Sequence, residues 1–188
     1  SKSEKKNIQN FVSFYQNNIN NQIQWIPQGQ FWTPKNIKEV ETIGVEFSFK
    51  SSFQLSKKWE LVSNFNYSYT DARTVKKSKE ESESILDKQL IYIPYYQANS
   101  FITISYQNTS LSIGNQYVGY QFTRPDNLDF ITSYFLTDLG LQKLVTKKSL
   151  DILLFGRINN LFNIEYEVRQ WYPMPKINYE LGIKLSIN

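Results

Sequence analysis

The chain has 188 residues, of which 40% are hydrophobic, 21 are basic and 17 are acidic, giving a net charge of +4. This positive excess is too small and too scattered to indicate a nucleic-acid partner. The chain has neither cysteine nor histidine, which excludes a disulfide scaffold, thiolate and imidazole metal ligands, and the usual base and nucleophile of acyl transfer. We therefore expect a single domain that is not an enzyme and that carries no cofactor and no metal.

The predicted elements are strands with a two-residue hydrophobic period. An interrupted pattern runs from Phe11 to Trp25, and a clear one from Ile43 to Lys50, where every odd position is apolar. Similar patterns, some weaker and some stronger, follow at 59–70, 100–106, 111–120, 134–145, 150–158 and 179–187. Together with the first two they predict about eight strands.

The links between these strands alternate in length. The short links are 54–58, 107–110 and 146–149, and the long links are 27–36, 71–97, 121–131 and 163–176. A barrel of hairpins has this alternation when one rim faces a confined compartment and the other faces the cell exterior.

Hydropathy decides how such strands could meet a membrane. The mean hydropathy is −0.47 and the longest wholly apolar run is 152–155, so no helix of about 20 apolar residues is available. A transmembrane strand needs only ~9–11 residues, half of them apolar. The chain is 16% aromatic, and tyrosine and tryptophan near strand ends are typical of a membrane interface. Packing of the same rings in the core of a soluble β-sandwich stays open at this point.

Six segments of the chain resemble one family. The segment Arg157–Glu167 (RINNLFNIEYE), the segment Trp171–Pro175 (WYPMP) and the alternating terminus Asn178–Asn188 resemble the C-terminal end of TonB-dependent outer-membrane receptors. Gly44-Val45-Glu46, the strand end Asn66–Arg73, and Tyr92-Ile93-Pro94 before Ala98 are similar to that family in the same order. The final Ile187-Asn188 departs from its usual aromatic end.

The resemblance implies an all-β fold of antiparallel, up-and-down transmembrane β-barrel strands, about eight of them, as a segment of a barrel of about 22 strands. Residues 1–188 would be the C-terminal part of this barrel, without the plug domain and the TonB box. The family implies the bacterial outer membrane as location. It also implies four partners: outer-membrane lipid, the remainder of the receptor barrel and plug, the TonB complex through the missing N-terminal region, and a small-molecule nutrient.

The implied function is active transport of a scarce nutrient. The segments Ile23–Pro27 and Phe31–Asn36 are similar to a hairpin of cobalamin transporters, and ferric-siderophore receptors share much of the C-terminal pattern. Loop aromatics and arginines are the candidate ligand-binding residues, with a role in the interface belt or in loop packing as the alternative for each: Trp25, Phe31, Trp32, Tyr120, Phe122, Arg124, Arg169, Trp171 and Tyr172.

Other functions stay open. One is a self-contained eight-stranded outer-membrane barrel that serves as an anchor or adhesin, and another is a soluble carbohydrate-binding β-sandwich. The carboxylate groups at Glu80–Glu83, Glu165 with Glu167, and Asp126 with Asp129 fit a solvated loop surface better than a glycosidase pair. A calcium site built from Asp126, Asn127 and Asp129 has no EF-hand spacing behind it.

Overall fold

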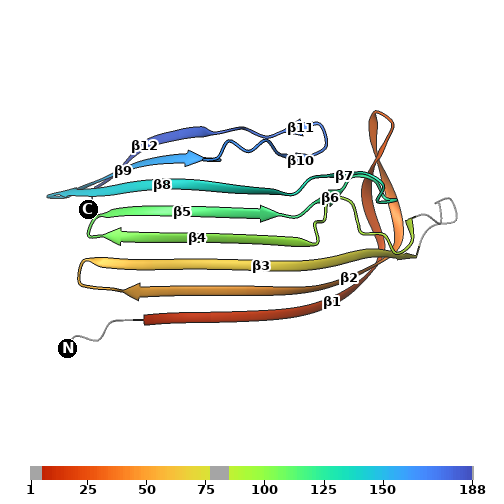
Figure 1. The fold of residues 1–188 in the computed structure, drawn as a ribbon, viewed down its shortest axis with the longest axis horizontal. Helices are drawn as coiled ribbons and strands as arrows, with labels where there is room; N and C mark the ends of the chain where they lie inside the picture. Colours follow the sequence, from red (N-terminus) through yellow and green to blue (C-terminus); the bar gives the residue numbers. More distant parts are fainter. Residues whose placement is uncertain (1–5, 77–84, 188) are drawn as a thin grey trace.

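The computed structural model describes residues 6–76 and 85–187. Its main element is one antiparallel sheet of eight strands, in the order β1-β2-β3-β4-β5-β8-β9-β12, drawn side by side in Figure 1. The strands are β1 (Lys6–Gln28), β2 (Phe31–Gln54), β3 (Trp59–Lys76), β4 (Tyr96–Tyr106), β5 (Thr109–Val118), β8 (Tyr134–Lys147), β9 (Leu150–Asn159) and β12 (Asn178–Ile187). Each strand pairs with its neighbour along the sheet, so the sheet is a meander.

Two small hairpins lie in the long links. They are β6 (Gln121–Phe122) with β7 (Phe130–Ile131), and β10 (Glu167–Arg169) with β11 (Tyr172–Pro173). The described residues contain no helix that could span a membrane. Long links gather at one end of the sheet, on the right in Figure 1, and short turns at the other. We call these the long-loop end and the short-turn end.

Six of the seven predicted links are short or long as expected, and one prediction is wrong. The predicted loop 27–36 is the end of a hairpin, in which β1 and β2 continue to a two-residue turn at Gly29 and Gln30. Gly29 has φ +64°, a conformation that glycine adopts at no steric cost. In its first part, before Glu39, β2 pairs only with β1. A strand in such a two-stranded ladder has one open side, which allows Pro27 and Pro34 within it.

The outer part of this hairpin bends away from the sheet, as Figure 1 shows. Asn21 has φ +57° and has no partner in the β1–β2 register. The β2–β3 register shifts at Glu39 and Val40. Irregularities of this kind bend and twist a strand pair, so we attribute the bend to them. The bend directs Trp32 toward the other long loops.

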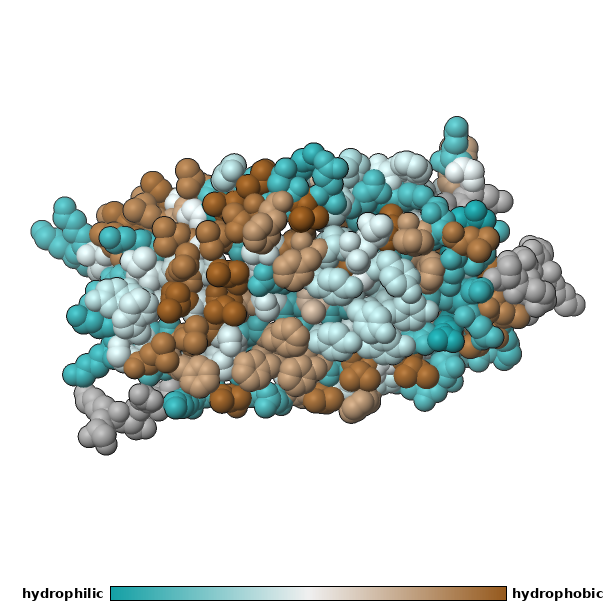
Figure 2. All heavy atoms as spheres, in the orientation of Figure 1, coloured by the Kyte–Doolittle hydropathy of each residue, from teal (hydrophilic) through white to brown (hydrophobic). Residues whose placement is uncertain are grey.

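The register gives the sheet one apolar and one polar face. Leu61, Ile104, Leu111 and Leu141 are successive partners across β3, β4, β5 and β8. The alternate positions form the polar face, where Ser48 lies beside Asn66 and donates to its Oδ1 at 2.9 Å. Figure 2 shows hydrophobic side chains gathered over the short-turn half of the sheet. One polar row interrupts the apolar face, but its members bond to one another: Asn115 Nδ2 donates to Ser100 Oγ at 3.1 Å, and Thr137 Oγ1 donates to Asn115 Oδ1 at 2.9 Å.

The described residues place no second layer of protein over the apolar face. Leu181 is 87% exposed and Ile183 is 69% exposed. The soluble β-sandwich therefore does not describe this fold, because a sandwich packs two sheets face to face. The described residues also show no pairing between the edge strands β1 and β12, so these eight strands form an open sheet rather than a closed eight-stranded barrel.

The buried clusters lie at the long-loop end. One contains Val40, Ala72 and Leu90, with Ile93 packed against it. The other contains Val118, Tyr134 and Leu136, with Ile164 and Tyr166 packed against it. Packing is thus concentrated where the loops leave the sheet, and it holds the loops in place.

Candidate functional site

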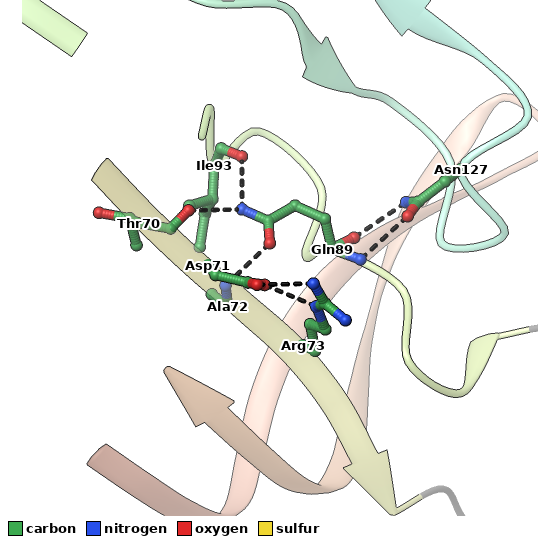
Figure 3. A network of polar contacts seen from close by, with 7 residues as sticks. All are labelled: Thr70, Asp71, Ala72, Arg73, Gln89, Ile93 and Asn127. Atoms are coloured by element: carbon green, nitrogen blue, oxygen red, sulfur yellow. Dashed lines mark hydrogen bonds and ion pairs between the residues drawn. The ribbon is translucent and has the colours of Figure 1, made fainter. Parts of the chain in front are cut away.

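The β3–β4 loop is fastened to β3 by the side chain of Gln89, which is 1% exposed. Its Oε1 accepts from the backbone N–H of Ala72 at 2.8 Å, and its Nε2 donates to the backbone oxygens of Thr70 at 3.2 Å and Ile93 at 3.1 Å (Figure 3). All three bonds replace contacts with water that burial removes. Gln89 therefore fixes the path of this loop.

Asn127 links the β3–β4 loop to the β6–β7 loop. Its Oδ1 accepts from the Gln89 N–H and its Nδ2 donates to the Gln89 carbonyl oxygen, both at 2.9 Å (Figure 3). The side chain thus binds the backbone of Gln89 as a paired strand would. A third bond joins the same loops, because the Tyr92 N–H donates to the Phe122 carbonyl oxygen at 2.9 Å.

Asn160 is the first residue of the β9–β12 loop, and its bonds fix the backbone path of the NNLFN segment. Asn160 is 3% exposed and has φ +52°, which asparagine tolerates better than most residues. Its Nδ2 donates to the Ile164 carbonyl oxygen and its Oδ1 accepts from the Ile164 N–H, both at 2.8 Å. Asn163 Oδ1 accepts from the Ile177 N–H at 3.1 Å, which joins the start of the loop to its end.

A cation and two rings join three separate segments. The guanidinium carbon of Arg169 lies 5.5 Å from the ring centroid of Trp32 and 5.4 Å from that of Tyr92, and the two rings are 5.9 Å apart. Trp32 comes from the β1–β2 hairpin, Tyr92 from the β3–β4 loop and Arg169 from β10. Cation–π attraction of this kind contributes about 0.5–2 kcal/mol. We call these three residues the Arg169 cluster.

A hydrogen bond beside this cluster ties the β6–β7 loop to the last loop. Gln170 Nε2 donates to Asp129 Oδ2 at 2.9 Å. This bond is the main reason that the pKa of Asp129 lies below its usual value. Burial raises the pKa of the nearby Tyr92 phenol above its usual value, so the phenol keeps its proton at neutral pH. The Arg169 cluster is therefore cationic.

A row of aromatic rings continues from the sheet into the loops. Tyr95 and Tyr120 have centroids 6.2 Å apart, and Tyr120 lies 5.4 Å from Phe122 and 5.9 Å from Phe130 in edge-to-face arrangements. Tyr69 begins the row on β3, 6.3 Å from Tyr95. Aromatic pairs at these distances are mutually stabilising.

A cavity of about 480 Å³ opens between β7 and the β9–β12 loop. Its walls include Phe130, Tyr166, Glu167, Trp171, Met174 and Lys176. Lys176 pairs with Glu165, so the wall carries charge as well as aromatic and sulfur-containing surface. Cavities of this size, lined by rings with a few polar groups, suit small-molecule ligands.

The predicted site residues fall into three pairs and three residues that lie apart. Trp32 and Arg169 meet in one cluster, and Tyr120 packs on Phe122. Trp171 lines the cavity and is 81% exposed, and the next residue, Tyr172, is 64% exposed. The other three lie apart: Trp25 and Phe31 are exposed on the hairpin, and Arg124 pairs with Asp126 at 2.6 Å. Ligand contact by any of the nine stays a prediction.

The acidic groups have other partners. Asp126 binds Arg124, Asp129 accepts from Gln170, and Asn127 binds Gln89, so these three do not converge as ligands of one ion. Across residues 6–76 and 85–187, no three acidic side chains are grouped to hold a metal. Glu80–Glu83 lie outside the described residues.

The sequence did not single out Tyr92, Gln89 or Asn127 as parts of the site. Tyr92 and Asn127 both have positive φ, +58° and +59°, and periodicity carries no signal for such turns. Gln89 was one polar residue among many in a charged segment. The proline two residues after Tyr92 was the available hint of an ordered turn.

Comparisons with known proteins agree with this architecture. The family model described as TonB dependent receptor-like, beta-barrel matches residues 7–161. BauA, the ferric preacinetobactin receptor from Acinetobacter baumannii, is similar in structure, with a TM-score of 0.68 and 17% identity over 94% of this chain and 27% of that chain. A search of curated proteins gave no match.

Two further structures are similar. The siderophore receptor PiuA from Acinetobacter baumannii has a TM-score of 0.68 and 18% identity, covering 94% of this chain and 26% of that one. The copper transporter OprC has a TM-score of 0.64 and 17% identity, covering 92% and 28%. Identities this low show a common fold alone. The chain spans about a quarter of the length of each of these structures.

Proposed function

Because the chain belongs to the TonB-dependent receptor β-barrel family, we propose that it forms the C-terminal wall and the ligand-facing loops of an outer-membrane receptor that imports a scarce nutrient. The remaining strands of the barrel would pair with the open edges of β1 and β12. A plug elsewhere in the receptor would couple transport to the TonB complex. The chain itself would supply no catalysis.

The proposed placement puts the apolar face against lipid and the polar face toward the lumen. Two bands of rings support this placement. The tilted rings of Trp59 and Tyr106 have centroids 4.7 Å apart at the short-turn end, and those of Tyr69 and Tyr96 lie 5.3 Å apart toward the long-loop end. Aromatic girdles flank the apolar band of outer-membrane barrels at both interfaces. The long loops would then face the cell exterior and the short turns the periplasm.

One observation carries the proposal for ligand binding: the long loops and the β1–β2 hairpin meet at the Arg169 cluster, beside a cavity lined by rings. The positive charge comes from Arg169, because Lys176 in the cavity wall pairs with Glu165. Such a surface suits a flat or aromatic nutrient with anionic groups, as a ferric siderophore has. The named receptors BauA and PiuA bind ferric or siderophore ligands, which supports this choice over cobalamin.

The test is uptake by the full-length receptor that contains this chain, expressed in a bacterium without its own receptors for the same nutrients. We expect accumulation of iron-55 supplied as a ferric catecholate siderophore, and a loss of about tenfold in apparent affinity for R169A, in keeping with the strength of a desolvated cation–π pair. R157A is the matched control, because Arg157 of β9 pairs with Glu180 outside the cluster and is not one of the candidate ligand-binding residues.

Cobalt-57 cobalamin is the second probe in the same cells. Uptake of cobalamin without uptake of any ferric siderophore would replace the siderophore proposal with the cobalamin one. Uptake of neither probe, in cells that display the assembled receptor, would contradict both.

A further inference from the structure

The short-turn end has a step in its rim. Lys143 of β8 pairs with Thr109, the first residue of β5. The rest of β8 continues to Lys147 beyond that point, and it pairs there with β9 alone. One bond closes the step, because the Leu144 N–H donates to the Asn108 carbonyl oxygen at 2.8 Å. The β8–β9 hairpin therefore stands out beside the lower β4–β5 turn.

A basic hollow of about 760 Å³ lies at this step. Its lining includes Lys57, Lys58 and Lys143 and no acidic residue. The Gln107 N–H donates to the Lys58 carbonyl oxygen at 2.8 Å, which holds the two neighbouring turns together. None of these three lysines forms an ion pair within the described part of the chain. The hollow therefore has positive charge without compensation.

An apolar groove of about 670 Å³ adjoins the hollow on the apolar face. Its lining includes Leu111, Leu141, Leu154 and Leu181, together with Lys143, which also lines the basic hollow. Gly156 lies between Leu141 and Leu181 in one row across the strands. The Leu181 side chain leans over Gly156, where an added Cβ would lie 3.1 Å from Leu181 Cδ2, and both residues line the groove.

We propose that the groove and the hollow together bind one anionic glycerophospholipid. An acyl chain would lie in the groove, and its phosphate headgroup would lie among Lys57, Lys58 and Lys143. Lys143 supports this occupant, because an ammonium group on a lipid-facing surface is costly unless it reaches a polar partner at the interface. Free phosphate would satisfy the charges but would leave the groove empty. The inference rests on the proposed placement of the apolar face against lipid.

The test is native mass spectrometry of the full-length receptor, delipidated in detergent and titrated with phosphatidylglycerol or phosphatidylcholine. We expect one tightly held phosphatidylglycerol and weaker retention of phosphatidylcholine. The variant K58Q/K143Q should bind phosphatidylglycerol at least about tenfold more weakly, since each lysine near an anionic headgroup contributes about fivefold. K147Q/K148Q is the matched control, with the same charge removed from the same rim outside the hollow.

Each outcome bears on the lipid site. An equal loss in both variants would mean general attraction between charges and would overturn the specific site, as would no loss in K58Q/K143Q. Displacement of phosphatidylglycerol by excess glycerol 3-phosphate would overturn the contribution of the groove. Uptake of labelled nutrient, measured separately, distinguishes failure of this inference from failure of the proposed transport, because the titration requires only an assembled barrel.

Discussion

Asn160 shows how one side chain can organise a long loop. Both of its amide atoms bond to Ile164, and its own backbone N–H donates to Asp138 Oδ1 at 2.8 Å. Asn160 is buried and its bonds are partly buried, so loss of the side chain leaves backbone groups of Ile164 without a partner. The left-handed backbone at this position also restricts the residues that can replace asparagine.

We expect Asn160→Ala to lower the free energy of unfolding of the full-length receptor by about 2 kcal/mol, because an unsatisfied buried group costs about 1–3 kcal/mol. Urea titration of the receptor in lipid vesicles measures this change. Asn159→Ala is the control, since it removes one exposed bond to Asn178. Equal effects of the two substitutions would contradict the assigned role of Asn160.

Asp129 makes the contact between the β6–β7 loop and the β9–β12 loop dependent on pH. Its pKa is lowered by the bond from Gln170, so its contribution to loop stability is present above the usual aspartate value, about pH 4. The contribution is lost as the pH falls through the lowered pKa. We expect protection from hydrogen exchange in residues 119–133 to fall as the pH drops below about 4, the usual aspartate value, after correction for intrinsic rates.

Asp129→Asn tests this assignment. Asparagine keeps the oxygen that accepts from the Phe130 N–H at 2.9 Å but does not titrate, so the acidic loss of protection should disappear. An identical acidic loss in the wild-type receptor and in the variant would place the pH-sensitive group elsewhere.

Strand periodicity predicted most of the sheet, because each strand has one face against a different environment. The segment 43–50 illustrates this: its odd residues share the apolar face with Phe65 and Tyr67 of the next strand. The outer part of the β1–β2 hairpin was not predicted. Gly29, Pro27 and Pro34 all indicate loops in a sequence, and only the pairing shows that a two-stranded ladder tolerates them.

The candidate site could be predicted only in part for a related reason. Trp32 and Arg169 stand out as a ring and a cation in long links, but their meeting depends on the bend at Asn21 and on the positive φ of Tyr92. The three contacts of the cluster join residues 60, 77 and 137 positions apart in the chain, and local patterns hold no information about them. The likeness of the NNLFN segment to its family identified a motif, whereas the bonds of Asn160 explain it.

The assignment of faces leads to a test at the level of a strand. Arg in place of Phe47 would put a charge on the proposed lipid-facing side, at a cost of about 2–4 kcal/mol near the membrane midplane. Ser48→Arg places the same side chain on the polar face. We expect heat-modifiable, assembled receptor in the outer membrane to be lost for Phe47→Arg and retained for Ser48→Arg. Similar assembly of both variants would refute the lipid-facing assignment.

Cysteines placed at two exposed serine positions would report the orientation of the molecule in the membrane. Ser133 lies between β7 and β8 at the long-loop end, and Ser149 lies in the β8–β9 turn. In whole cells, an impermeant thiol reagent should label Ser133→Cys and leave Ser149→Cys unlabelled. The chain has no native cysteine, and any cysteine elsewhere in the receptor would be replaced first. Labelling at Ser149→Cys alone would invert the orientation.

The meander order of the sheet has a consequence for the rate of assembly. Strands that neighbour each other in space also follow each other in the order of the chain, so each pairing closes a comparatively short loop and loses little chain entropy. Folding is fast when contacts are local. Within the described residues, the β2–β3, β4–β5 and β8–β9 hairpins have the shortest turns, together with β1–β2, whereas β3–β4, β5–β8 and β9–β12 are joined by long loops. The hairpins with short turns are therefore expected to form first, and the pairings across the long loops are expected to join them into one wall later.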